Sequence, residues 1–198
     1  MYEILRRIVS FIFKMAFNLK VEGIENLPKT NFIICANHTS FLDPFIIAAS
    51  IPKRIYFLAL GKFYKIFWIK WFLKIFNAIP ATPKGGTVQK AVYLLNKDKN
   101  IGIFPEGTRS FDGKLKEFKK GVAILGYKTG RPIVPCGIIG AYECLPRGAK
   151  FPKFSQIKLK IGKPIYLLKE PYEVIDEVKI QWGLLKLKNA ISELVKSY

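Results

Sequence analysis

The sequence predicts a single α/β domain in which helices flank a mixed, largely parallel sheet. Short apolar runs alternate along the chain with segments of helical period, the order that βα units produce. The 198 residues suit one domain, and no internal repeat, low-complexity tract or Gly/Ser linker divides them. Hydrophobic residues make up 50% of the chain, which excludes intrinsic disorder. We expect residues 1–20 to form an N-terminal helix and residues 21–198 to form the domain itself.

The first element, 1–20, is expected to be a basic amphipathic helix. Its charges leave no run of about 20 apolar residues, which a spanning helix needs, and Lys14 interrupts the apolar region of a signal peptide. The polar residues at helical spacing are Glu3, Arg7, Ser10, Lys14 and Asn18. The apolar surface includes Leu5, Ile8, Ile12, Met15 and Leu19. The pattern fits a helix packed on a core as well as a helix that lies in the plane of a membrane.

The other elements follow in order along the chain. Apolar runs predict strands at 32–35, 55–60, 101–104, 133–138 and 157–161. Helical periodicity predicts helices at 44–50, 63–76, 87–96, 117–128 and 173–195, the last with Gly183 as a candidate break. Two polar loops, 36–44 and 105–121, directly follow strands, and ligands of open α/β sheets bind at the carboxyl ends of strands.

The segment 62–76 carries aromatic and basic side chains on opposite sides of its predicted helix. The aromatic side includes Tyr64, Trp68, Trp71, Phe72 and Ile75, and the basic side includes Lys62, Lys65, Lys70 and Lys74. Trp and Tyr beside Lys are typical of the lipid headgroup zone. An aromatic face buried in the core would give the same stripe.

The charge balance favours acidic partners. Lys and Arg number 33 against 14 Asp and Glu, which gives a formal net charge of +19. A basic chain with this much apolar side chain suits an anionic membrane surface and phosphate ligands better than nucleic acid. Cys35, Cys136 and Cys144 show no C-x-x-C spacing and are expected to be reduced core residues of a cytosolic protein. One His and scattered thiols are too few ligands for a zinc site, so no metal is expected.

His38 is the only histidine, and it lies in the first polar loop. A neutral imidazole accepts a proton near neutral pH, and a carboxylate nearby can fix its tautomer. Asp43, five residues further on, is within reach across the turn that leads into the next helix. Asp before Pro44 is also a favoured helix start, so an N-cap is the alternative role for Asp43.

The second polar loop contains Glu106, Gly107, Thr108 and Arg109. Arg binds phosphate through two parallel hydrogen bonds, and exposed backbone N–H groups in a turn around Gly107 would form an anion nest. The loop suits a phosphomonoester, although an ordinary Pro-Glu-Gly turn with solvated charges has the same composition. Fingerprints of competing chemistries are absent: the sequence has no G-x-S-x-G, no G-x-x-x-x-G-K-[ST] and no G-x-G-x-x-G.

Four ordered blocks resemble the glycerolipid acyltransferases, specifically the bacterial 1-acyl-glycerol-3-phosphate acyltransferases. NHTSFLD at 37–43 is similar to their N-H-x-[ST]-x-x-D block, and FPEGTRS at 104–110 to their F-P-E-G-T-R-S block. The Lys-containing segment 61–80 and IVPCGI at 133–138 resemble the two further blocks. The likeness covers 32–139.

The resemblance implies a role for each matching residue. His38 would be the general base, and Asp43 the carboxylate that orients it. The acceptor phosphate site would comprise Glu106, Gly107, Thr108 and Arg109, with Lys62 as a further contact.

One position departs from the family pattern. Many members place an Arg shortly after the Ile-Pro that corresponds to Ile79 and Pro80, but this chain continues Ala-Thr-Pro-Lys. Either Lys84 substitutes as a point charge, without the bidentate fork of Arg, or that contact is missing.

The expected function is therefore a peripheral membrane O-acyltransferase on the cytoplasmic side of the cell membrane, docked through its N-terminal helix. His38 would deprotonate the free hydroxyl of 1-acyl-glycerol-3-phosphate (lysophosphatidic acid) as that oxygen attacks an acyl thioester, and phosphatidic acid would form. The thioester would be carried by acyl carrier protein or coenzyme A, and no other cofactor is expected. The alternatives are another lysolipid or glycerol-3-phosphate as acceptor, and a non-enzymatic basic module that binds membrane or nucleic acid. Only an enzyme needs His38.

Overall fold

A computed structural model describes residues 2–60, 79–81, 86–168 and 175–196. One sheet of seven strands, in the order β1-β7-β6-β2-β5-β3-β4, forms its centre. The strands are β1 Lys20–Glu22, β2 Ile33–Ala36, β3 Ile55–Leu60, β4 Ile79–Ala81, β5 Asn100–Ile103, β6 Ile133–Ile139 and β7 Lys158–Ile161. Neighbours from β6 to β4 are parallel, whereas β7 runs antiparallel to β6 and parallel to β1. The predicted α/β domain with a largely parallel, mixed sheet is confirmed.

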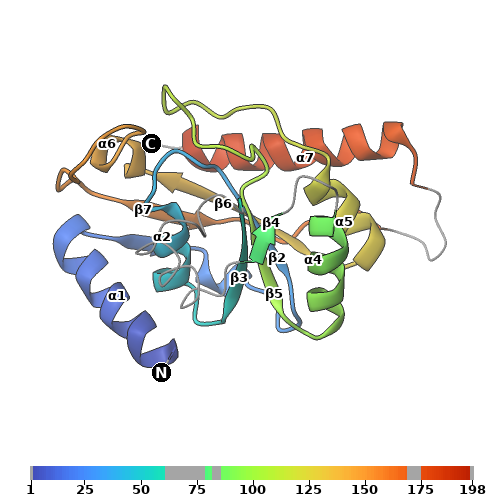
Figure 1. Ribbon diagram of the computed structural model, residues 1–198, viewed down its shortest axis with the longest axis horizontal. Helices are drawn as coiled ribbons and strands as arrows, with labels where there is room; N and C mark the ends of the chain where they lie inside the picture. Colours follow the sequence, from blue (N-terminus) through green and yellow to red (C-terminus); the bar gives the residue numbers. More distant parts are fainter. Residues whose placement is uncertain (1, 61–78, 82–85, 169–174, 197–198) are drawn as a thin grey trace.

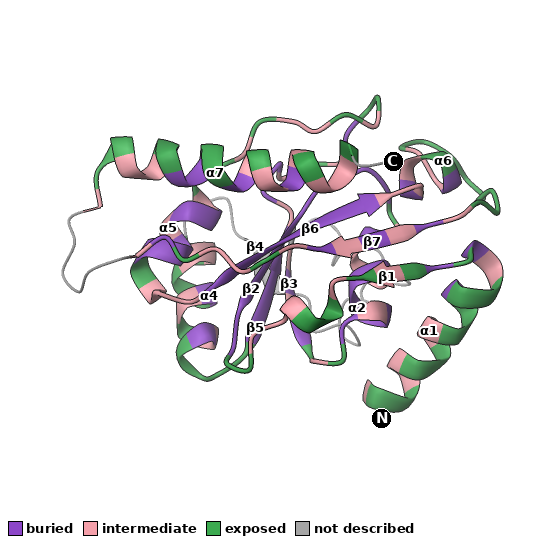
Figure 2. Ribbon diagram, turned by 180° about the vertical axis from the view of Figure 1, so that it is seen from behind, coloured by how far each residue is buried: buried purple, intermediate pink, exposed green. Residues whose placement is uncertain are grey.

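Helices cover both faces of the sheet, as Figures 1 and 2 show. They are α1 Tyr2–Phe17, η1 Ile24–Asn26, α2 Asp43–Ser50, α4 Gly86–Asn96, α5 Gly121–Thr129, α6 Ala141–Cys144 and α7 Glu177–Lys196. On β2, Ile34 and Ala36 join the core cluster of α1 and α2, and the alternate residues Ile33 and Cys35 join that of α4, α5 and α7. Both faces of β2 are therefore buried, which explains its continuous apolar run.

Helix α1 has a buried side and an exposed apolar side. Phe13 and Phe17 are buried in the core, and the Phe13 ring stacks on Phe45 of α2 at 6.5 Å. The opposite side exposes an apolar stripe of Ile4, Ile8, Phe11, Ile12 and Met15. Leu19, expected on the apolar surface of the helix, instead lies beyond its end and is buried. Among the described residues, no helix has the length and apolar content needed to cross a bilayer.

Several element boundaries differ from those expected. The helix expected at 117–128 begins at Gly121. The stretch before it lies against the preceding loop, where the N–H groups of Lys116 and Lys119 donate to Glu106 Oε2 and the Pro105 carbonyl. Gly183 does not break α7, since the helix continues through it with this residue buried. The short elements β1, β4, η1 and α6 were not expected. The helix predicted at 63–76 lies outside the described residues.

Candidate active site

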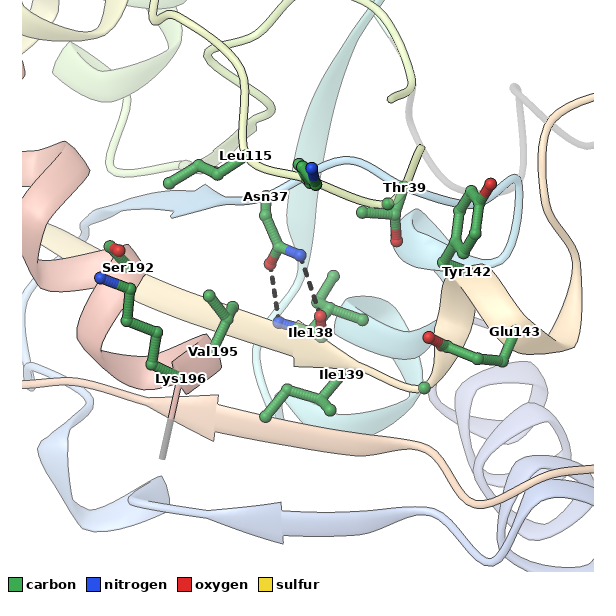
Figure 3. Close-up of a pocket in the computed structure, with 13 residues that line it drawn as sticks. Asn37, Thr39, Leu115, Ile138, Ile139, Tyr142, Glu143, Ser192, Val195 and Lys196 are labelled. Carbon is green, nitrogen blue, oxygen red and sulfur yellow. Dashed lines mark hydrogen bonds between the residues drawn. The ribbon is translucent and has the colours of Figure 1, made fainter. Parts of the chain in front are cut away.

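The first polar loop leaves the sheet at the carboxyl end of β2. Asn37 fixes its start, since the side-chain amide donates to the Ile138 carbonyl (2.9 Å) and its oxygen accepts the Ile138 N–H (2.7 Å) at the end of β6 (Figure 3). The Ser40 hydroxyl donates to the Leu145 carbonyl at 2.8 Å and ties the same loop to the segment after α6. The loop between these two anchors therefore has little freedom to move.

His38 and Asp43 form a hydrogen-bonded pair across this loop. His38 Nδ1 lies 2.8 Å from Asp43 Oδ2, which also accepts the N–H groups of Thr39 and Ser40, each at 2.8 Å. Asp43 is fully buried and is the first residue of α2 rather than its N-cap, which is Leu42. Its carboxylate turns back to the loop instead of capping the helix. An ionised carboxylate only accepts hydrogen bonds, so Nδ1 carries the proton and Nε2 is the basic nitrogen.

The His38 ring rests on an apolar surface. It stacks on Phe104 with ring centroids 4.1 Å apart and planes 18° apart, and Phe104 in turn stacks on Phe57 of β3 at 6.0 Å. The His38 side chain is 20% exposed. The stack and the Asp43 hydrogen bond thus fix the orientation of an imidazole that solvent and substrate can still reach.

Glu106 connects the second polar loop to the first. Oε1 accepts the His38 backbone N–H at 2.8 Å, Oε2 accepts the N–H of Lys116 at 3.1 Å, and the Ser110 N–H donates to the His38 carbonyl at 2.8 Å. Burial raises the pKa of the Glu106 carboxyl above its ordinary value, although the hydrogen bonds from the His38 and Lys116 N–H groups act to lower it. Both carboxylate oxygens face backbone donors, so the geometry gives Glu106 a positioning role for the loop that carries His38.

Gly107 occupies a turn with a backbone conformation that other residues rarely adopt. Its φ of 69° is left-handed, and a Cβ there would lie 2.7 Å from Lys119 Nζ. The Gly107 N–H donates to the Phe104 carbonyl at 3.0 Å. The prediction that this N–H is an exposed donor for an anion nest is therefore wrong. The turn instead brings the Lys119 ammonium beside the loop.

Arg109 and Arg147 bring two guanidinium groups together. Arg109 lies over the Phe41 ring at 5.7 Å, and its pKa is lowered by burial and then by the charge of Arg147. Arg147 Nη1 reaches the Thr108 hydroxyl at 3.4 Å, and its Cζ lies 3.9 Å from the Phe111 ring centroid. Neither guanidinium forms an ion pair with a carboxylate in the described part of the chain. The pair is thus a cationic patch suited to an anionic ligand.

No sequence motif pointed to Arg147 as a site residue. It lies 38 residues after Arg109, and no motif spacing connects the two. The Tyr142 hydroxyl donates to the Phe111 carbonyl at 2.9 Å, so α6 packs on the second polar loop and delivers Arg147 to it. Of the sequence-predicted site residues, the structure brings together all except Lys62, which lies outside the described residues, as does Lys84.

A cavity of about 370 Å³ lies beside the first polar loop (Figure 3). Asn37, Thr39, Tyr142 and Glu143 are among the residues that line it. His38 does not line this cavity, so a molecule bound there would contact Asn37 and Thr39 of the first polar loop rather than the imidazole.

The fold and this pair of loops belong to a recognised class. A family model described as Acyltransferase matches residues 18–139, a range that includes both loops, and the chain belongs to this acyltransferase family. The resemblance seen in the four sequence blocks is thereby confirmed.

Relatives with the name 1-acyl-sn-glycerol-3-phosphate acyltransferase occur in plants and in bacteria. The chain is 32% identical over 158 residues to the chloroplastic 1-acyl-sn-glycerol-3-phosphate acyltransferase of Arabidopsis thaliana, covering 76% of this chain and 44% of that protein. It is 28% identical over 171 residues to the Bacillus subtilis enzyme of the same name, covering 84% and 83%. The crystal structure of the 1-acyl-sn-glycerophosphate acyltransferase PlsC from Thermotoga maritima superposes with a TM-score of 0.75 at 28% identity, covering all of this chain and 82% of that one. The chain spans less than half the length of the chloroplastic relatives.

Proposed function

We propose that this protein transfers a fatty acyl group from a thioester to the 2-hydroxyl of 1-acyl-sn-glycerol-3-phosphate and forms phosphatidic acid. The observation that carries the proposal is the His38–Asp43 hydrogen bond at 2.8 Å, in a partly exposed position near the cationic patch of Arg109 and Arg147. The names of the relatives in bacteria and plants support the same acceptor.

The mechanism follows from the free nitrogen of His38. Nε2 removes the proton of the acceptor hydroxyl as its oxygen attacks the thioester carbonyl, and the buried Asp43 carboxylate stabilises the imidazolium that forms. The new C–O bond forms as the C–S bond breaks, and the proton passes from the imidazolium to the departing thiolate. Cys35 and Cys136 are buried with raised pKa values, and the Ser40 hydroxyl donates to a backbone carbonyl, so the described part of the site offers no activated nucleophile among them. This favours direct transfer over an acyl-enzyme.

The acceptor phosphate would bind at the cationic patch. Arg109 and Arg147 offer two forks of N–H donors, and Lys119 adds a point charge beside Gly107. Thr108, which already accepts from Arg147, holds that second guanidinium in place. In this proposal Glu106 acts through the backbone of His38 and does not touch the phosphate, and Lys62 stays an expected contact.

The location we propose is the cytoplasmic side of the cell membrane, with the protein attached peripherally. Cys35, Cys136 and Cys144 are buried and free, as expected in a reducing compartment. The exposed apolar stripe of α1 would lie against the bilayer. Acyl carrier protein or coenzyme A would deliver the acyl group. Alkaline carbonate extraction of membranes from producing cells checks the attachment, since it releases a peripheral protein and leaves an integral one in the membrane.

Acyl transfer by purified His38→Ala and Asp43→Asn variants tests the proposal. We expect kcat to fall by about 10²–10⁴-fold in each, because the base and its orienting carboxylate act as one unit. Asp98→Asn is the matched control for the second variant, since Asp98 is exposed and far from the loops. Acceptors to compare are 1-acyl-glycerol-3-phosphate, 1-acyl-glycerol and glycerol-3-phosphate. Wild-type rates in a folded His38→Ala protein would exclude the mechanism.

A further inference from the structure

The loop 145–156, between α6 and β7, has a composition that its fold does not explain. It contains three basic residues, Arg147, Lys150 and Lys153, and no acidic residue. Phe151 and Phe154 are 82% and 76% exposed, the largest exposures among the aromatic residues of the described chain. Soluble surfaces rarely keep two phenyl rings this exposed next to each other.

The loop is nevertheless held in a defined position. At its base the Lys153 N–H donates to the Cys144 carbonyl at 2.7 Å, and the Cys144 thiol donates to the Ser155 carbonyl at 3.4 Å. The Ala149 N–H donates to the Pro146 carbonyl at 3.1 Å, which closes a turn inside the loop. The exposed rings are thus presented by a folded segment.

The loop also contacts the C-terminal end of α1. The Phe154 ring lies 5.7 Å from that of Phe17 at the end of α1, and the Ile157 N–H donates to the Phe17 carbonyl at 2.9 Å. Figures 1 and 2, which view the molecule from opposite sides, both show the loop beside the C-terminal end of α1. The Phe154 ring therefore packs at the end of the helix that carries the exposed apolar stripe.

We propose that the loop 145–156 is a membrane-contacting element that inserts Phe151 and Phe154 into the interface of an anionic bilayer, with Lys150 and Lys153 at the headgroups. Aromatic rings interleaved with lysines match the apolar and charged layers of that interface, and the absence of acidic residues removes any repulsion from anionic lipids. An anionic bilayer is favoured over a protein partner because α1, next to the loop, exposes a further apolar stripe flanked by Arg7 and Lys14.

This contact would set the distance between the active site and the bilayer surface. The carbonyl of Leu145, the first residue of the loop, accepts a hydrogen bond from the Ser40 hydroxyl of the first polar loop. Arg147 reaches the Thr108 hydroxyl of the second polar loop. Insertion of Phe151 and Phe154 would therefore place both polar loops at a set distance from the bilayer. Membrane contact itself does not depend on the proposed acyl transfer, so vesicle binding tests it separately.

The direct test places a polarity-sensitive fluorophore on Phe151→Cys. The three native cysteines are buried, so the new thiol is the one open to labelling. We expect a blue shift and stronger emission when vesicles of phosphatidylcholine with about one third phosphatidylglycerol are added. The same label on Tyr93→Cys, an exposed aromatic position on α4 at the other end of the molecule, should not respond. Unchanged emission at position 151 in protein that co-sediments with the vesicles would overturn the proposal.

A second test measures vesicle partitioning. Phe151→Ser should bind anionic vesicles about tenfold more weakly, as expected for loss of one inserted phenyl ring, whereas Tyr93→Ser should bind like the wild type. Lys150→Glu with Lys153→Glu should weaken binding more than the charge-matched pair Lys90→Glu with Lys99→Glu, because the four lysines are all exposed but only the first pair is in the loop. Thermal unfolding of each variant separates weak binding from loss of fold.

A carrier-protein surface would give a different outcome. If the loop docks an acidic acyl carrier, Phe151→Ser and the Lys150/Lys153 double variant would lower turnover of the carrier-bound donor on detergent-dispersed acceptor while vesicle binding stayed at the wild-type level. That result would overturn the membrane assignment. Loss of vesicle binding with unchanged turnover of dispersed acceptor supports it.

Discussion

At the scale of single residues, the spacing of His38 and Asp43 predicted a contact that the structure contains, but the sequence left two roles open for Asp43. The structure selects between them because the carboxylate accepts the N–H groups of Thr39 and Ser40, which fold the loop back on itself. The hydrogen bonds of Glu106 and Arg147 could not be predicted from the sequence, since their partners come from elements that only the folded sheet brings together. A motif identifies a residue, but its hydrogen-bond partners depend on the strand order.

Arg147 is predicted to contribute to acceptor binding. Arg147→Ala should raise the KM for 1-acyl-glycerol-3-phosphate by about tenfold or more with a smaller change in kcat, since it removes a charge-assisted contact to phosphate. Arg131→Ala is the matched control, because Arg131 is far from the polar loops and pairs only loosely with Asp98 at 3.8 Å. With 1-acyl-glycerol, which lacks the phosphate, Arg147→Ala and the wild type should differ little. An equal loss with both acceptors would remove Arg147 from the phosphate site.

The buried carboxyl of Glu106 predicts a pH dependence of stability. Because its pKa is raised in the folded protein, the native state holds a proton that the unfolded state releases once the pH exceeds the ordinary value of about 4.5. The free energy of unfolding should therefore decline as pH rises from there through the folded pKa. Glu106→Gln cannot ionise, so its decline across this window should be shallower, as urea unfolding at a series of pH values would measure.

The control for this measurement is Glu25→Gln, which removes an exposed carboxyl. That variant should keep the wild-type pH profile. Parallel profiles for wild type and Glu106→Gln would show that burial of Glu106 has no effect on the pKa of its carboxyl.

At the scale of elements, the long periodic segments were predictable and the short ones were not. The strands at β2, β3, β5 and β6 and the helices α1, α2 and α4 lie within a few residues of their expected places. The three-residue strands β1 and β4 exist because they pair with β7 and β3, a tertiary cause that no local pattern of three residues reveals. Likewise, α5 starts later than expected, and the stretch before it packs on Pro105 and Glu106 through tertiary hydrogen bonds that the local pattern does not reveal.

Substitution of two phenylalanines of α1 by alanine should affect the stability of the protein very differently. Phe13 is 6% exposed and packs in the core, whereas Phe11 is 65% exposed in the apolar stripe. Phe13→Ala should lower the free energy of unfolding by about 3–5 kcal/mol, and Phe11→Ala should change it by no more than about 0.5 kcal/mol. Chemical denaturation measures both.

Vesicle binding of these two variants should show the reverse order. Phe11→Ala should weaken partitioning to anionic vesicles, while folded Phe13→Ala should bind normally. If Phe11→Ala destabilises the protein as much as Phe13→Ala does, α1 is a core helix on both sides and the exposed stripe has another explanation.

At the scale of the whole molecule, the net charge of +19 acts over distances that no single contact explains. Charge composition already pointed to anionic partners, and the structure adds that three of the cationic side chains, Arg109, Arg147 and Lys119, lie at the second polar loop. A field of one sign speeds the encounter with an acidic partner, and salt removes the effect because the screening length is about 10 Å at 0.1 M ionic strength.

The acyl donor should therefore be distinguishable by its salt dependence. Acyl carrier protein, as an acidic macromolecule, presents many charges to this field, so kcat/KM for the carrier-bound donor should fall steeply between about 0.02 and 0.3 M salt. Acyl coenzyme A carries its few charges on a small molecule and should show a shallower slope. Detergent-dispersed acceptor keeps membrane binding out of the measurement, and Lys90→Glu with Lys99→Glu checks whether charge at the far end of the molecule contributes. Equal slopes for the two donors, or a preference for the coenzyme A thioester at every salt concentration, would exclude steering of a carrier protein, and the positive charge would then serve the bilayer and the acceptor phosphate alone.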